Sequence, residues 1–203
     1  MTTFYVDLDR TLFRTECAEE IFAAIEKVYP DATTIRGGYG KRREYYVFPH
    51  RATGDETTYY HDLVAQLCDA GLEPQAVFST IHAELSDGRF EYPGASSFIS
   101  LLRSLGEVKI LTYGEDAYQR FKASLCLSLQ GTEVITLIGL KAEYLNSHAS
   151  AGDWIIDDKR LHGLAVGIRA LCIQHDNQVP ADVHSLAEAG ELIRREILKE
   201  RIA

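Results

Sequence analysis

The chain has 203 residues, of which 46% are apolar and 25% charged, a composition typical of a globular protein with one domain and a modest insertion. Disordered, collagen-like and low-complexity proteins are therefore excluded. The 30 acidic residues outnumber the 21 lysines and arginines, and the net charge of −9 disfavours broad binding to nucleic acid or to anionic membranes, which depends on surplus positive charge.

Two further features concern the cellular compartment. No apolar run reaches the ~18 residues of a membrane-spanning helix, and the N-terminal residues lack the basic start and apolar segment of a signal peptide. The four cysteines lie far apart and form no C-x-x-C motif, so we expect reduced, mostly buried thiols. These features predict a cytoplasmic protein; they do not indicate an oligomeric state.

Five short apolar runs predict the strands of a parallel sheet. Their apolarity is continuous rather than alternating, which strands need when helices cover both faces of the sheet. The runs are residues 3–7, 108–112, 133–138, 154–157 and 170–174. Helical patterns follow the last four runs, at residues 118–125, 141–145, 161–168 and 185–202. This alternation predicts a doubly wound α/β sheet of five parallel strands.

The interval between the first two strands breaks this alternation. Residues 12–107 contain no convincing strand, but helical patterns are present at residues 18–28, 63–68, 74–85 and 98–105. We therefore predict a core of residues 1–13 and 92–203 with an inserted helical segment, residues 14–91. Inside the insertion, residues 35–46 lack periodicity and hold three glycines, which predicts a mobile loop.

The clearest chemical signal is the segment DLDRTLF, residues 7–13, at the end of the first predicted strand. Ligands of parallel sheets gather at the carboxyl ends of the strands. The carboxylates of Asp7 and Asp9 can converge there, and such a pair suits either a hard divalent metal or a nucleophile with a general acid. The competing interpretation is an acidic cap for the next helix, with Thr11 as a second capping residue.

A second pair of acids decides between these interpretations. The segment WIIDDK, residues 154–159, ends another buried strand in Asp157 and Asp158. A solvated turn would explain one such pair, but two strands that deliver four acids to the same edge of the sheet favour a functional site.

Two weaker signals follow the second and third strands. In ILTYG, residues 110–114, an apolar strand ends in the hydroxyl of Thr112 and continues through Tyr113 and Gly114. This hydroxyl and nearby N–H groups can hold a phosphoryl oxygen, although a structural helix cap is the commoner role. Lys141 follows the third strand, where it can neutralise phosphate and nucleophile, although a surface lysine is the commoner interpretation.

In order and spacing, DLDRTLF, ILTYG, Lys141 and WIIDDK resemble the four motifs of the haloacid dehalogenase-like hydrolase superfamily. The resemblance covers the whole chain and implies a Rossmann-like core with a helical cap inserted after the first motif. It implies that Asp7 is the nucleophile, Asp9 the general acid and base, Thr112 the phosphate-holding hydroxyl and Lys141 the charge-neutralising lysine. It also implies Mg²⁺, held by Asp7, the backbone carbonyl of Asp9 and an acid of the fourth motif.

Two details depart from the family pattern. Gly152 and Asp153, with Asp157, match an alternative form of the fourth motif, but no apolar strand precedes them. We therefore take Asp158 as the direct metal ligand and Asp157 as its neighbour or water-mediated partner. Lys141 lacks the proline that follows the lysine in many relatives, and Lys122 is the alternative, although it lies inside a helix before the third strand.

Asp9 discriminates between reactions. Dehalogenating relatives do not keep an aspartate at this position, because displacement of halide leaves no oxygen to protonate, whereas phosphoryl transfer needs that proton. We therefore predict a Mg²⁺-dependent phosphatase that hydrolyses a small organic phosphomonoester through an aspartyl-phosphate on Asp7. The alternatives are a phosphomutase of the same fold and a binding or regulatory protein without turnover.

Substrate contacts are expected from residues near the first two motifs and from the insertion. Near the motifs, the candidates are Arg10, Thr11, Tyr113 and Gly114. Candidates toward the insertion are Glu16, Arg36, Lys41, Arg42, Arg43 and Tyr45, of which the basic cluster at residues 41–43 is a candidate for a second anionic group of the substrate. No zinc, P-loop or dinucleotide-binding motif is present in the sequence.

Overall fold

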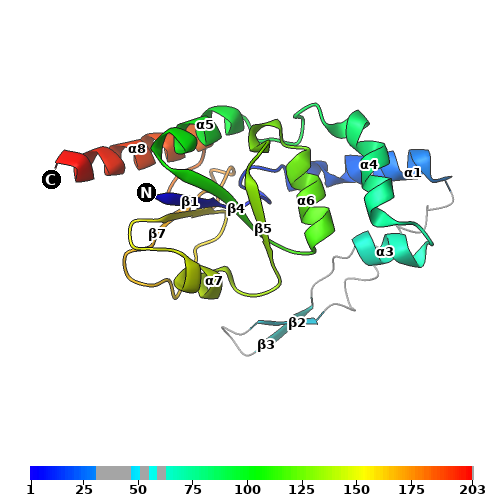
Figure 1. Cartoon of the computed structure of the whole chain (residues 1–203), viewed down its shortest axis with the longest axis horizontal. Coiled ribbons are helices and arrows are strands. Elements are labelled where there is room, and N and C mark those ends of the chain that lie inside the picture. The colour runs from blue at the N-terminus through cyan, green and yellow to red at the C-terminus, as the bar shows by residue number, and fades with distance from the viewer. Residues whose placement is uncertain (31–46, 51–54, 59–62, 203) are drawn as a thin grey trace.

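The computed structural model describes residues 1–30, 47–50, 55–58 and 63–202. Its centre is a sheet of five parallel strands in the order β5-β4-β1-β6-β7 (Figure 1). The strands are β1 (Thr3–Val6), β4 (Glu107–Tyr113), β5 (Glu133–Leu137), β6 (Trp154–Asp157) and β7 (Arg169–Cys172). The predicted five-stranded parallel sheet is confirmed, with boundaries within two residues of those expected.

Helices cover both faces of this sheet. The helices that follow or precede core strands are α5 (Ala95–Leu105), α6 (Asp116–Ser124), α7 (Lys141–His148) and α8 (Leu186–Ile202). Alternation along β1 directs Phe4 and Val6 into the large core with α5, α6 and α8, whereas Tyr5 packs in a smaller cluster with Leu145 of α7. Burial on both faces explains the continuous apolarity of the strands.

The register of the sheet places the ends of β1 and β6 next to each other. Val6, the last residue of β1, pairs with Ile110 of β4 and with Ile156 of β6. The next residue, Asp7, donates its N–H to the Ile156 carbonyl at 2.8 Å. The residues that follow β1 and β6 therefore lie side by side at one edge of the sheet.

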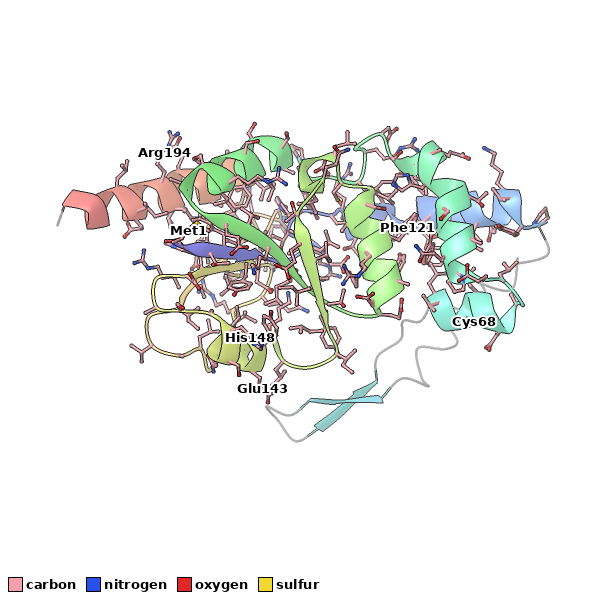
Figure 2. All side chains as sticks on the ribbon, in the orientation of Figure 1. Met1, Cys68, Phe121, Glu143, His148 and Arg194 are labelled. Carbon is pink, nitrogen blue, oxygen red and sulfur yellow. The ribbon has the colours of Figure 1, made fainter. Side chains whose placement is uncertain are left out.

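The segment between β1 and α5 contains a short 3₁₀ turn (Thr15–Cys17), α1 (Ala18–Val28), α3 (Leu63–Asp69) and α4 (Pro74–Leu85). Its helices pack on one another and on α6, which carries Phe121 (Figure 2). The ring of Phe121 stacks on that of Phe78 of α4, with ring centroids 4.5 Å apart. Pro74 begins α4, as expected for a proline in the first turn of a helix.

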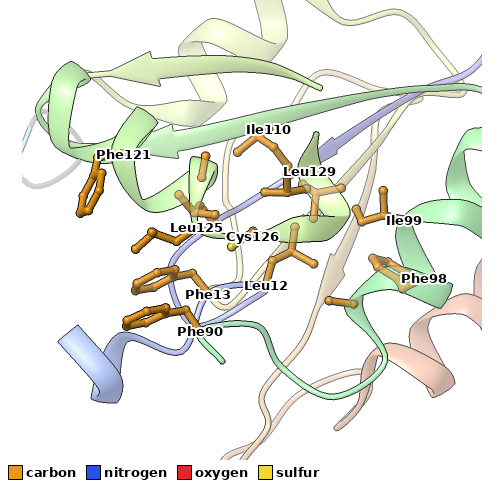
Figure 3. Close-up of a cluster of buried hydrophobic side chains, with 14 of the residues drawn as sticks. Leu12, Phe13, Phe90, Phe98, Ile99, Ile110, Phe121, Leu125, Cys126 and Leu129 are labelled. Carbon is orange, nitrogen blue, oxygen red and sulfur yellow. The ribbon is translucent and has the colours of Figure 1, made fainter. Parts of the chain in front are cut away.

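The chain enters this segment at residues 12–14 and leaves it at residues 90–92, and these two stretches of backbone are hydrogen-bonded to each other. Arg14 donates its N–H to the Phe90 carbonyl at 2.7 Å, and Tyr92 donates to the Leu12 carbonyl at 2.9 Å. The rings of Phe13 and Phe90 stack with centroids 5.4 Å apart inside the buried cluster (Figure 3). The division into a core of residues 1–13 and 92–203 and a cap of residues 14–91 stays a prediction.

Two sequence-based expectations were wrong. Residues 12–107 were expected to lack strands, but β2 (Val47–His50) and β3 (Asp55–Thr58) form an antiparallel pair apart from the main sheet. The segments VFPH and DETT hide this pair, because Pro49 has no N–H for a ladder and the second segment has no apolar alternation.

The helix expected at residues 161–168 is not formed. Gly163 and Gly167 adopt positive φ angles of 75° and 97°, which break a helix. The side chain of Asn146 donates to the Gly163 carbonyl at 2.8 Å and accepts the Ala165 N–H at 2.6 Å. The apolar spacing has another cause, since Leu161 and its apolar neighbours pack on the second face of the sheet from a loop.

The remaining expectations concern membrane-spanning helices, the cysteines and the loop at residues 35–46. Among the described residues, no helix combines the length and apolarity needed to cross a membrane. All four cysteines are free; Cys126 and Cys172 are buried as expected, whereas Cys17 is half-buried and Cys68 exposed. The loop expected at residues 35–46, with Arg36, Lys41, Arg42, Arg43 and Tyr45, lies outside the described residues.

Candidate active site

Two buried carboxylates share one lysine at the carboxyl edge of the sheet. Lys141 begins α7, and its ammonium lies 2.5 Å from Asp7 Oδ1 and 2.6 Å from Asp157 Oδ2. The three side chains are 11%, 7% and 4% exposed, respectively. Burial alone would lower the pKa of Lys141, but the two carboxylates outweigh this effect and raise it, so the lysine is held as a cation.

Asp158 completes an acidic cluster. Carboxylate oxygens of Asp7, Asp157 and Asp158 lie within 4.8 Å of one another, and all three residues are buried. Burial, with the charge of Asp157, raises the pKa of Asp7 to about 7 and that of Asp158 to about 6. When all three carboxyl groups ionise, their negative charge exceeds the positive charge of the two lysines that act on them, Lys141 and Lys159. An oxygen-only donor set with excess negative charge fits a hard divalent cation such as Mg²⁺.

The turn after β6 orients this cluster. Asp157 Oδ1 accepts the Lys159 N–H at 2.9 Å, which fixes the carboxylate across the turn. The carbonyl of Asp158 accepts hydrogen bonds from the amide of Gln174 and from Cys172 Sγ, the latter at 3.7 Å. The backbone of the cluster is therefore held by residues at the end of the neighbouring β7.

Asp9 lies in a different environment from Asp7. Lys122 Nζ, on α6, lies 2.6 Å from its Oδ1 and 2.5 Å from its Oδ2. Thr15 Oγ1 donates to Oδ1 at 3.2 Å, and Gln119 Nε2 donates to Oδ2 at 3.4 Å. Burial alone would raise the pKa of Asp9, but Lys122, Gln119 and Thr15 together lower it. Asp9 is therefore held as a carboxylate, 29% exposed.

The motif at the end of β4 is linked to Asp9 through Gln119. The buried Thr112 donates its hydroxyl to Gln119 Oε1 at 3.1 Å, and Gln119 Nε2 donates to the Tyr113 carbonyl at 2.9 Å. Gly114, at φ 141°, leaves room for this amide, because a Cβ there would collide with Gln119 Nε2 and lie 3.2 Å from its Cδ. The Gly114 N–H donates to the Leu137 carbonyl at 2.9 Å. The phosphate-holding role of Thr112, Tyr113 and Gly114 stays a prediction.

The first motif forms a tight turn. The N–H groups of Leu12 and Phe13 donate to the Leu8 carbonyl at 3.0 and 2.8 Å. Thr11 is buried, and its hydroxyl lies 3.5 Å from Asp7 Oδ2. Arg10 is exposed and has a φ of 62°, the one positive φ at a non-glycine position among the described residues. A strained residue beside Asp7 and Asp9 is a feature that clusters at functional sites.

The geometry distinguishes the two alternatives that the sequence left open. Lys141 contacts Asp7, whereas Lys122 contacts Asp9, so the two lysines serve different carboxylates. Asp153 accepts the N–H groups of Thr3 at 2.7 Å and of Ser150 at 2.8 Å, at the opposite end of β6 from the acidic cluster. Asp153 therefore fixes the start of the strand and takes no part in this site.

Sequence reasoning missed Gln119 entirely and named Lys122 only as an alternative to Lys141. Both are buried polar residues, three positions apart on α6 and therefore on one face of the helix. A glutamine and a lysine with this spacing, directly after a strand-end motif and between aromatic residues, are the signal that could have found them.

The fold was compared with known proteins. No family model matches the chain, and no curated protein matches it. A structure from Burkholderia xenovorans, described as a haloacid dehalogenase-like hydrolase, covers 94% of this chain and 97% of its own, with 18% identity and a TM-score of 0.61. A HAD hydrolase of Bacillus subtilis, described as bound to magnesium, covers 95% of this chain and 98% of its own, with 16% identity and a TM-score of 0.52.

The L-2-haloacid dehalogenase of Xanthobacter autotrophicus matches equally far along the chain, covering 96% of it and 99% of its own length, with 18% identity and a TM-score of 0.51. Enzymes of different chemistry thus share this architecture, and the identities are low enough that the likeness concerns the fold. Each of these matches extends over more than nine-tenths of this chain. The chain has the fold of the haloacid dehalogenase-like hydrolase superfamily.

Proposed function

We propose that this protein is a Mg²⁺-dependent phosphatase acting on a small organic phosphomonoester. One observation carries the proposal: Asp7 and Asp9 follow the same strand, β1, but have different partners. Asp7 belongs to the acidic cluster with Lys141, whereas Asp9 is paired with Lys122 outside that cluster. Two carboxylates in distinct environments suit a nucleophile and a separate proton carrier.

The chain's own residues supply a balanced hydrolysis. An oxygen of Asp7 attacks phosphorus, the bond from phosphorus to the leaving oxygen breaks, and Asp9 gives that oxygen a proton. Water then attacks the phosphorus of the aspartyl-phosphate while Asp9 takes its proton, which releases phosphate and restores Asp7. Lys141 holds the Asp7 carboxylate and offsets negative charge. Mg²⁺, which Asp7, Asp157 and Asp158 would hold, neutralises the cluster and stabilises the phosphoryl oxygens when bound.

The resting state of Asp9 bears on the two proton transfers. Its pairing with Lys122 favours the carboxylate, the form needed to take a proton from water. The acid step requires Asp9 to separate from Lys122 and carry a proton. The presence of this second carboxylate also favours phosphoryl transfer over dehalogenation, in which the departing halide needs no proton.

The test is an assay of phosphate release from p-nitrophenyl phosphate and a panel of metabolite phosphates, with Mg²⁺ and after chelation by EDTA. A parallel assay measures halide release from 2-chloropropionate. We expect Mg²⁺-dependent phosphate release that Asp7→Asn abolishes and that Asp87→Asn, at an exposed carboxylate paired with Arg89, leaves unchanged. Halide release without phosphate release, phosphoryl transfer to a sugar hydroxyl instead of water, or full activity of Asp7→Asn would overturn the proposal.

A further inference from the structure

We infer that Lys122, supported by Gln119, is a positioning residue that keeps the carboxylate of Asp9 off the metal cluster. The inference rests on the proposed function, in which a divalent cation binds Asp7, Asp157 and Asp158. It gives two side chains of α6 a role in the site. It also explains why only three of the four aspartates at this edge of the sheet form the cluster, with Asp9 apart from it.

The first argument is geometric. Asp7, Asp157 and Asp158 gather their oxygens within 4.8 Å, and Asp9 is not part of this group although it lies two residues from Asp7. Both oxygens of Asp9 are occupied by Lys122, at 2.6 and 2.5 Å. The Asp9 carboxylate is therefore engaged by Lys122 and stands apart from the cluster that would bind a metal.

The second argument concerns the fixed position of the lysine. The Lys122 side chain is 5% exposed, and its ammonium lies 4.9 Å from the ring centre of Tyr118 and 5.5 Å from that of Phe13. Aromatic faces at these distances attract a cation and exclude water from it. Lys122 therefore behaves as a fixed charge inside the protein, unlike a surface lysine that exchanges partners with solvent.

The hydrogen bonds of Gln119 help to fix the orientation of the Asp9 carboxylate. Its amide oxygen accepts the Thr112 hydroxyl, and its NH₂ group donates to the Tyr113 carbonyl and to Asp9 Oδ2. With both ends of the amide occupied, the side chain cannot turn without breaking several hydrogen bonds. The absence of a side chain at Gly114 makes this position of Gln119 available. The β4 motif thus helps to orient Asp9.

The consequence is a division of labour between the two aspartates of the first motif. Without a fixed cation on α6, the carboxylate of Asp9 would be free next to the cluster and would be attracted to the bound metal. Such an ion has room for further oxygen ligands, since Ca²⁺, for example, accepts six to eight. Lys122 offers Asp9 a competing partner. The Asp9 carboxylate is thereby kept off the metal, and separation from Lys122 frees it for proton transfer.

The test counts the water molecules on a bound ion, using Tb³⁺ as a luminescent probe with Ca²⁺-like ligand preferences. Luminescence lifetimes in H₂O and D₂O give the number of coordinated waters, and calorimetry gives the Ca²⁺ affinity. In Lys122→Met, Asp9 is freed, and we expect the loss of about one or two coordinated waters. We also expect Ca²⁺ binding about tenfold tighter, because the affinity of oxygen-ligand sites rises with the number of charged ligands. Both changes should disappear in the double variant Lys122→Met with Asp9→Asn.

Two control variants test whether the effect is specific to Lys122. Lys109→Met removes a lysine at the start of β4, which pairs with Glu133 at 3.0 Å, and should change neither quantity. Lys122→Arg keeps the positive charge and should restore the wild-type number of waters. A change in net charge alone would alter Ca²⁺ affinity but not the water count, so the count separates ligation from electrostatics.

Each outcome decides the matter. An unchanged water count in Lys122→Met overturns the inference while leaving the phosphatase proposal intact. If neither Tb³⁺ nor Ca²⁺ binds to the wild type or to Lys122→Met, both proposals are overturned. If Lys122→Met does not fold, Asp9→Asn alone supplies the answer. That variant should keep the wild-type water count, and a gain of about one or two waters would show that Asp9 is a ligand in the native protein.

Discussion

Replacing Asp7 by asparagine should stabilise the metal-free protein while it abolishes activity. Asp7 shares Lys141 with Asp157 and lies in one buried cluster with Asp158, and burial is the main reason that the pKa of Asp7 is raised from 3.8 to about 7. A shift of about three units corresponds to about 4 kcal/mol of unfavourable free energy for ionised Asp7 in the folded state. Asparagine keeps the shape of the side chain and removes that charge.

The sign of the pH dependence follows from the raised pKa. Because the folded protein holds this proton more tightly than the unfolded chain, the stability of the wild type falls as pH rises from 3.8 to about 7. At pH 8 the full penalty of about 4 kcal/mol applies, whereas at pH 5 the folded protein keeps the proton and the penalty is about 2 kcal/mol. The advantage of Asp7→Asn should therefore be larger at pH 8.

The measurement is thermal unfolding followed by circular dichroism at pH 5 and pH 8, in EDTA. For a chain of this length, about 4 kcal/mol corresponds to an increase in Tm of about 10 °C. Asp87→Asn, at an exposed carboxylate, is the control and should show no such increase. An Asp7→Asn protein that is less stable than the wild type at pH 8, or whose advantage does not depend on pH, would refute the reasoning about the cluster.

Further predictions concern the cluster and its supports. Millimolar Mg²⁺ should raise the Tm of the wild type, because a ligand that binds only the folded state stabilises it. An equal Tm in Mg²⁺ and in EDTA would contradict this expectation. Asp157→Asn should abolish the Mg²⁺-induced increase, whereas Asp153→Asn should lower the Tm but keep the increase, since Asp153 only fixes the start of β6. Gly114→Ala should cost about 1–3 kcal/mol in chemical denaturation, through strain and collision with Gln119; an unchanged midpoint would argue against the packing described. Lys141→Met should destabilise the metal-free protein by about 3–5 kcal/mol, because two buried carboxylates lose their cation, and urea unfolding measures it.

The sequence by itself determined the sheet and the edge at which the site forms. Continuous apolar runs predict strands buried on both faces, and acids directly after two such runs must lie together, because parallel strands deliver their carboxyl ends to one edge. For this reason Asp7, Asp157 and Asp158 could be named in advance. The same local reasoning failed at residues 161–168, where apolar spacing arose from a loop packed on the sheet.

Only the tertiary structure decided how the charges pair. Lys141 meets an aspartate 134 positions away, and Lys122 meets one 113 positions away. Both lysines were candidates for a single role, and nothing in their local sequence assigns each to its own carboxylate. The partners of Gln119 could not be assigned from the sequence for the same reason, because they come from β4 and from the turn after β1. Local patterns encode periodicity and burial, whereas ion pairs across a core depend on where distant helices pack, which only the folded chain defines.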